Sequence, residues 1–91
     1  MMVVIINGNN IHGKEELHDT LQAQLGLDQT YGRNLDALWD CLTGSIPMPL
    51  TIQWLDFHAS RKSLGEYADR LLDLMREAEE EVENFTFDVK V

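Results

Sequence analysis

Three short strand-like segments, separated by long helical segments, constrain the fold of this chain more than any other feature. The first, Val3 to Asn7, is a run of β-branched residues that ends at an Asn-Gly turn signal. The second, LTIQWLDF from Leu50, and the third, FTFDVKV from Phe85, alternate apolar and polar residues, as strands with one dry face do. Because the connections are long enough to hold helices, the strands are predicted to pair in parallel.

Helical patterns occupy the connections between these strands. Leucines recur at every fourth position of KEELHDTLQAQLGL, and Gly26 marks the end of this first helix. A second helix is predicted to begin after an Asn34 cap and to end near Gly44. A third, from about residue 64 to residue 82, carries an apolar stripe opposite acidic residues.

The order of these elements predicts an α/β fold. The alternation in the second and third strands leaves one face of the sheet largely uncovered, so the helices are expected on the other face. Right-handed crossovers on one face then make the sheet grow in one direction. We therefore predict a two-layer sandwich of helices on a three-stranded parallel sheet with strand order 1-2-3. The 91 residues suit a single domain, residues 1–91.

The net charge and composition of the chain limit the kinds of partner that it is expected to bind. Sixteen acidic residues against seven basic ones give a net charge of −9, which argues against nucleic acid as a ligand and favours a basic protein partner. No apolar run is long enough to cross a membrane, and the first residues do not resemble a secretion signal. The lone Cys41 excludes an internal disulfide, as suits a reducing compartment. We expect a cytoplasmic protein that does not bind membranes.

The second helix has a polar face that its stability does not explain. Taking 100° per residue, its leucines form a core stripe, whereas Asp36, Asp40 and Thr43 gather on another side with Trp39 at the border. The helix dipole favours Asp36 in the first turn, but Asp40 lies nearer the negative end and repels Asp36. A solvated polar face would account for two Asp residues, yet an adjacent indole is typical of a binding hot spot.

Catalysis and metal binding receive little support from the sequence. A carboxyl group acting as an acid needs a pKa raised by burial, and both Asp residues point from an exposed helix face. His12, His18 and His58 lie in three segments without ligand spacing, so surface or boundary positions are expected for them. Cys41 is expected to be a buried thiol. We predict no catalytic residue, no metal and no cofactor, and hence a protein that is not an enzyme.

The stretch YGRNLDALWDCLTG, from Tyr31 to Gly44, resembles the signature of the barstar family. Members are small intracellular inhibitors of secreted guanine-specific ribonucleases such as barnase. The N-terminal VVIING, the LHDTL segment and the REA of the last helix match in the same order, so the resemblance covers nearly the whole chain. It implies a three-stranded parallel sheet packed on helices, the fold that the pattern of elements also predicts.

The resemblance also implies a mode of action and a set of contact residues. In the family, the second helix and the loop before it block the enzyme's active site, and one carboxylate occupies the pocket for the RNA phosphate. That carboxylate corresponds to Asp40. The positions that match partner contacts are Thr30, Tyr31, Gly32, Asn34, Asp36, Trp39, Asp40, Thr43, Gly44 and Glu77. The implied partner is a basic secreted or toxin ribonuclease, bound by a protein that is monomeric when free.

Two departures from the family pattern leave the target enzyme open. Thr30 and Ser45 stand where members with the best-known target have aromatic residues. The target could be the cell's own secreted ribonuclease or the toxin of another strain. Two other functions also stay open, a regulatory module that binds another basic protein and a small acid-dependent hydrolase. Met48-Pro49 falls where the family can hold a cis peptide, and the sequence does not decide the isomer.

Overall fold

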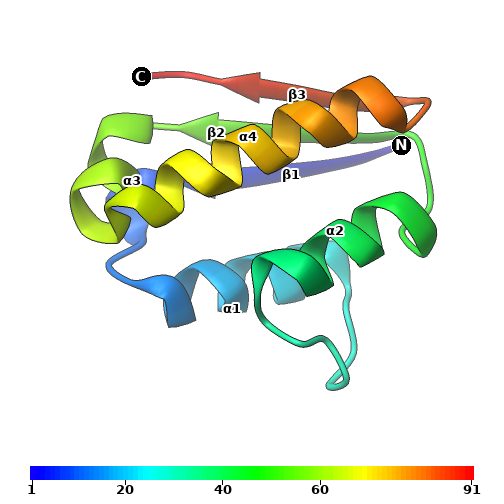
Figure 1. The fold of residues 1–91 in the computed structure, drawn as a ribbon, viewed down its shortest axis with the longest axis horizontal. Helices are drawn as coiled ribbons and strands as arrows, with labels where there is room; N and C mark the ends of the chain where they lie inside the picture. Colours follow the sequence, from blue (N-terminus) through cyan, green and yellow to red (C-terminus); the bar gives the residue numbers. More distant parts are fainter.

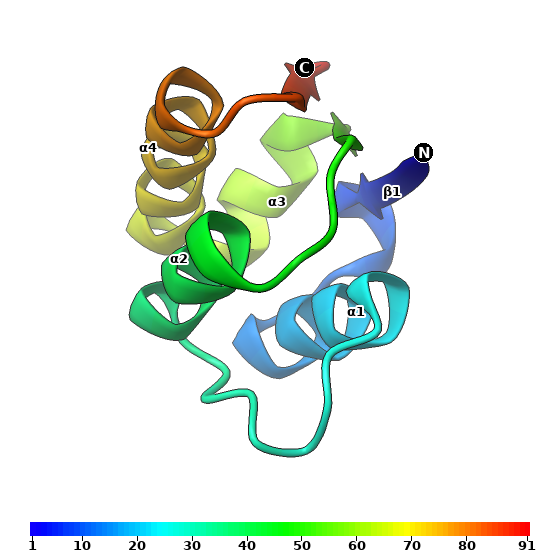
Figure 2. The same cartoon turned by 90° about the vertical axis from the view of Figure 1, so that its right-hand side faces the viewer.

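The structure, a computed structural model, describes all of residues 1–91 and places every helix on one face of a three-stranded sheet (Figures 1 and 2). The elements in chain order are β1 (Met2–Asn7), the 3-10 helix η1 (Gly8–Asn10), α1 (Lys14–Leu25), α2 (Leu35–Gly44), β2 (Leu50–Leu55), α3 (Phe57–Leu64), α4 (Glu66–Glu81) and β3 (Phe85–Val89). The three predicted strands and three predicted helices are all present, and α3 is additional.

The sheet has the predicted topology. Its strands run in the order β1-β2-β3 with both pairs parallel. Val4 lies opposite Ile52, which lies opposite Phe87, so one inward-facing row crosses the sheet and packs under the helices. On the other face Val3 and Ile5 are 51% and 43% exposed. This uncovered face confirms the two-layer arrangement inferred from the alternation.

The ends of α1 and α2 lie where the sequence predicted them. Gly26 follows α1 with a φ of 68°, a left-handed conformation that glycine adopts without strain, and its N–H donates to the Gln22 carbonyl. Asn34 precedes α2 in an extended conformation, and its side-chain oxygen accepts a hydrogen bond from the Ala37 N–H at 2.8 Å. These caps set the boundaries of the loop that joins the two helices.

The helix α3 was not predicted from the sequence, because contacts with neighbouring elements stabilise it, among them the hydrogen bond from the Phe57 N–H to the Lys90 carbonyl at 2.9 Å. Strand β2 ends at Leu55, and the next residue has a φ of 54° and begins the turn into α3. The Phe57 ring then packs edge-on against Trp54, with centroids 4.9 Å apart, and the Trp54 indole donates to the Ser60 hydroxyl at 2.9 Å. A segment of eight residues with two basic side chains and few apolar ones gives little periodic signal by itself.

Gly8, the first residue of η1, allows this short helix to approach the start of α3. A Cβ atom at this position would lie 2.2 Å from the Asp56 carbonyl oxygen and 2.6 Å from the Ser60 hydroxyl oxygen. No side chain fits at those distances, so the close approach requires glycine.

Two predictions about individual side chains need correction, and one open point is decided. The expectation that His18 occupies a surface or boundary position is wrong, because it is buried and only 2% exposed, whereas His12 and His58 are exposed. Cys41 is only half-buried, on the edge of the core, because its position on α2 turns partly away from the sheet. The Met48-Pro49 peptide bond is cis.

None of the helices is both long enough and apolar enough to cross a membrane.

Candidate partner-binding surface

The two carboxylates of α2 are displayed on a helix whose opposite side is anchored in the core. Leu38 and Leu42 are 0% and 1% exposed, and they fix the rotation of the helix about its axis. Asp36 and Asp40 lie on the exposed side, as the 100° periodicity predicted. The rotation is therefore set by buried apolar area, and the position of both charges follows from it.

Trp39 and the C-terminal turn of α2 complete this face. Trp39 is half-buried and packs against the core with part of its indole, as expected for a border position. The Thr43 hydroxyl donates to the Trp39 carbonyl at 2.8 Å, so its hydrogen is already used while its oxygen can still accept. Gly44 is exposed and ends the helix.

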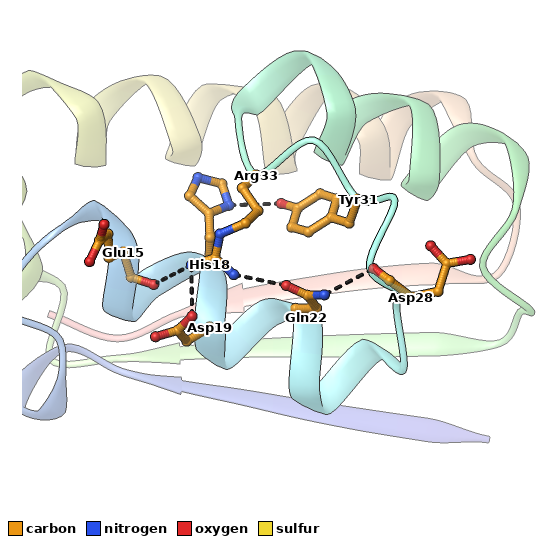
Figure 3. Close-up of polar contacts among 7 residues, drawn as sticks. All are labelled: Glu15, His18, Asp19, Gln22, Asp28, Tyr31 and Arg33. Carbon is orange, nitrogen blue, oxygen red and sulfur yellow. Dashed lines mark hydrogen bonds and ion pairs between the residues drawn. The ribbon is translucent and has the colours of Figure 1, made fainter.

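The loop between α1 and α2 is held to α1 by side-chain hydrogen bonds (Figure 3). Arg33, which has a φ of 55°, donates to the Gln22 side chain at 2.8 Å and to the Asp19 carboxylate at 2.7 Å. The Gln22 amide in turn donates to the Asp28 carbonyl at 2.9 Å. Because these bonds reach both halves of the loop, they favour one conformation of the backbone from which the predicted contacts project.

Tyr31 supports the loop from inside. Its side chain is 7% exposed, and its hydroxyl lies 2.8 Å from Nδ1 of His18. Nε2 of the same imidazole lies 2.7 Å from the Tyr67 hydroxyl, so one buried ring links α1, the loop and α4. Burial lowers the pKa of His18 and raises the pKa of Tyr31, because each charged form would lose its hydration. Only an edge of the Tyr31 side chain is left for a partner.

The acidic residues at this face have no ion-pair partner within the chain. The structure contains four ion pairs, and they engage Glu16, Asp19, Asp69 and Asp88. Glu77 is exposed on α4, which lies beside α2 in both views (Figures 1 and 2). The charges of Asp36, Asp40 and Glu77 therefore remain open to an external cation.

Comparison with known proteins relates the full length of the chain to one family. The sequence profile of the Barstar family, described as "Barstar (barnase inhibitor)", matches residues 1–91. The chain belongs to the Barstar family. A relative from Bacillus subtilis (strain 168), named "Putative ribonuclease inhibitor YrdF", is 46% identical over 84 residues, which cover 92% of each chain.

The structure brings most of the predicted Barstar contact positions to the loop and one side of α2. Two of them are not fully exposed: Tyr31 is buried and Trp39 is half-buried. The exposed ones are Thr30, Gly32, Asn34, Asp36, Asp40, Thr43, Gly44 and, on α4, Glu77. Asn34 also serves as the cap of α2, so its side-chain oxygen has a structural role besides any contact with a partner. Their role as contacts stays a prediction.

One acidic residue of this Barstar-family surface, Asp28, was not predicted from the sequence. Its carboxylate accepts hydrogen bonds from the Thr30 N–H at 2.8 Å and from the Thr30 hydroxyl, and these bonds lower the pKa of Asp28. The Asp-x-Thr spacing is a signal for such a turn and could have identified it. Asp28 and Asp40 both line a hollow of about 460 Å³ between the loop and α2.

Proposed function

We propose that this Barstar-family protein is an intracellular inhibitor of a barnase-like, guanine-specific ribonuclease. Residues 1–91 form one domain that acts in the cytoplasm as a monomer until it binds its target. The partner is a basic secreted or toxin ribonuclease. The inhibitor neither binds nucleic acid nor requires a cofactor, and it catalyses no reaction.

One observation carries this proposal. Asp36 and Asp40 are exposed without an ion-pair partner on a helix that Leu38 and Leu42 hold rigidly against the core. The two carboxylates repel each other in the free protein, which slightly destabilises the helix. A cationic partner removes this repulsion. An RNA-cleaving site concentrates positive charge to hold phosphate and is therefore complementary to this face.

The inhibition follows from occupation of the enzyme's active site. Asp40 takes the place of the RNA phosphate and accepts charge-assisted hydrogen bonds from the basic residues that would otherwise bind substrate. Asp36 and Glu77 increase the rate of encounter through their long-range attraction. The anchored loop presents Gly32 and Asn34 in one conformation, which reduces the entropy lost on binding.

An inhibition assay tests the proposal directly. The protein is titrated into barnase and into basic secreted ribonucleases from related bacteria, with cleavage of a guanine-containing RNA as the readout. We expect stoichiometric inhibition of at least one enzyme by the wild type. Asp40→Asn should lose most of this inhibition. The control Asp88→Asn, which removes one negative charge from the uncovered face of the sheet, should inhibit like the wild type. Full inhibition by Asp40→Asn would contradict the proposed mode of binding.

Thr30 and Ser45 give a second candidate function some support. Both are small and line the hollow beside α2, where the family pattern has aromatic side chains. A regulatory module that binds another basic protein would need the same acidic face but not those aromatic contacts. Absence of inhibition against every ribonuclease tested, together with salt-dependent binding to a different basic protein, would favour this alternative.

A further inference from the structure

The strand β1 has a sequence that is unusual for the edge of a sheet. Val3 to Ile6 form a continuous β-branched run, a pattern typical of a central strand, yet the strand order places β1 at one edge. It contains neither a charged residue nor a proline, which commonly keep edge strands from pairing with other chains. Val3 and Ile5 are also exposed on the uncovered face. An open strand of this composition is prone to self-association.

A side chain of α1 closes the outer edge of β1. Successive residues of a strand direct their backbone groups to opposite sides, and the Met2 N–H donates to the Pro49 carbonyl just before β2. Ile5 therefore directs its N–H and its carbonyl outward. This N–H donates to the Gln24 side-chain oxygen at 2.9 Å, and the Gln24 amide donates to the Ile5 carbonyl at 2.7 Å. Gln24 thus makes the two bonds that a residue of an antiparallel neighbour would make.

The opposite edge of the sheet is closed in a related way. The Lys90 N–H donates to the Trp54 carbonyl of β2, so the Phe87 N–H points to the outer side of β3. The Glu79 carboxylate accepts a hydrogen bond from this N–H at 2.8 Å. Because α1 packs beside β1 and α4 beside β3, each edge receives a side chain from its neighbouring helix (Figure 1). Unlike β1, the strand β3 also carries an exposed charge, Asp88.

We propose that Gln24 keeps the protein monomeric by preventing β1 from pairing with β1 of a second copy of this chain. Without the Gln24 amide, the outward N–H and carbonyl of Ile5 are free, and two β1 strands related by a two-fold axis can exchange these bonds. A second copy fits this edge because β1 has no charge, so two identical strands do not repel each other through their side chains. The inference does not depend on the proposed function.

Sedimentation of Gln24→Ala tests this role. The substitution removes the amide but keeps a strong helix former on α1. Gln29→Ala is the matched control, because Gln29 is exposed in the loop between α1 and α2. We expect monomers for the wild type and the control, and dimers of Gln24→Ala with a dissociation constant at least about ten-fold lower. Salt should favour these dimers, since it screens the repulsion between chains of net charge −9. Dimers of the wild type, or monomers of Gln24→Ala at every concentration, would overturn the proposal.

A second substitution distinguishes pairing of folded edges from aggregation of unfolded chains. Val3 is 51% exposed, so Val3→Lys adds a charge to the open strand without disturbing the core. In the Gln24→Ala background it should restore the monomer, because lysine on an edge strand opposes pairing with another strand. Dimers that persist in this double variant would show that association does not occur through β1, which would contradict the proposal.

Amide hydrogen exchange, followed by NMR, reports on the edge itself. In dilute solution the Ile5 amide should exchange about ten-fold faster in Gln24→Ala than in the wild type, because it has lost its acceptor. The Val4 amide, which faces β2, should keep its rate in both proteins. In concentrated Gln24→Ala, where the dimer forms, exchange of Ile5 should become slow again. Equal exchange of Ile5 in the two dilute proteins would mean that Gln24 does not close the edge, and the proposal would fail.

Discussion

Nδ1 of His18 lies 2.8 Å from the Tyr31 hydroxyl, and this buried contact ties the loop before α2 to α1. The contact on the other side of the ring, to Tyr67, extends the link to α4. A neutral imidazole has one donor and one acceptor nitrogen, so each hydroxyl meets a ring nitrogen of the matching kind. The loop before α2 is therefore tied to α1 and α4 through a histidine whose burial lowers its pKa and favours its neutral form.

We predict that acid weakens the folded state through His18. Burial, followed by the positive charge of Arg33, lowers the pKa of His18 below its usual 6.5, while Asp19 opposes and Lys14 reinforces this shift. Because the unfolded chain then binds the proton more readily, this contribution to stability is complete above pH 6.5 and is lost as pH falls toward the folded-state pKa.

Urea unfolding of wild type and His18→Gln, measured from about pH 7.5 to about pH 5.5, checks this prediction. Glutamine retains a donor and an acceptor but does not titrate, so the variant should be less stable at neutral pH yet lose less stability on acidification. The difference between the two proteins isolates His18 from the many carboxylates. Parallel pH dependences would contradict a role for His18 protonation.

Asp40→Ala should separate stability from binding. The change removes repulsion with Asp36 and improves helix propensity, so the free energy of unfolding should stay nearly unchanged or rise slightly. In the complex, the substitution leaves the partner's cations without their counter-charge, so the binding free energy should weaken by about 2–5 kcal/mol. Thermal unfolding measures the stability, and calorimetric titration against an inhibited ribonuclease measures the binding free energy. We expect no other single truncation on this face to weaken binding more.

The purified protein should neither cleave RNA nor bind it at physiological salt. Its net charge of −9 repels the phosphate backbone, and its exposed carboxylates lack the burial that acid catalysis needs. Fluorescently labelled RNA serves for both measurements, cleavage by gel and binding by anisotropy. RNase activity that co-purifies with the protein through repeated chromatography would establish a hydrolase instead.

Aromatic side chains at positions 30 and 45 should increase affinity for barnase. Thr30→Tyr together with Ser45→Trp restores two large contact surfaces of the family pattern, while the acidic face that attracts the enzyme is unchanged. We expect similar, salt-dependent association rates for both proteins and slower dissociation of the double variant. Binding time courses with immobilised barnase decide the point, and equal dissociation rates would show that these positions do not set the target.

Gly8→Ala should destabilise the fold by about 1–3 kcal/mol or more, because the added methyl would meet the Asp56 carbonyl oxygen at 2.2 Å. Gly44→Ala is the matched control, since a Cβ there meets nothing within 4 Å. It should leave stability unchanged or slightly higher through better helix propensity. Urea unfolding compares the two variants, and equal effects would mean that η1 and α3 are not in close contact.

Local patterns in the sequence were sufficient to predict the topology of the sheet, the ends of α1 and α2, and the exposure of Asp36 and Asp40. In each case one period, of two residues in a strand or 3.6 in a helix, decides which side chains face the core. The helix cap at Asn34 likewise depends on neighbours within three residues. These features could be predicted because their causes lie close together along the chain.

Tertiary structure alone decided the surroundings of His18, the helix α3 and the hollow beside Asp40. His18 is buried because Tyr31 and Tyr67, 13 and 49 residues away, supply hydroxyl partners for both ring nitrogens. The first residue of α3, Phe57, donates its N–H to the carbonyl of the distant Lys90, and the hollow exists only where the loop folds back against α2. Burial and hydrogen bonding between distant segments follow from packing, which no local period encodes.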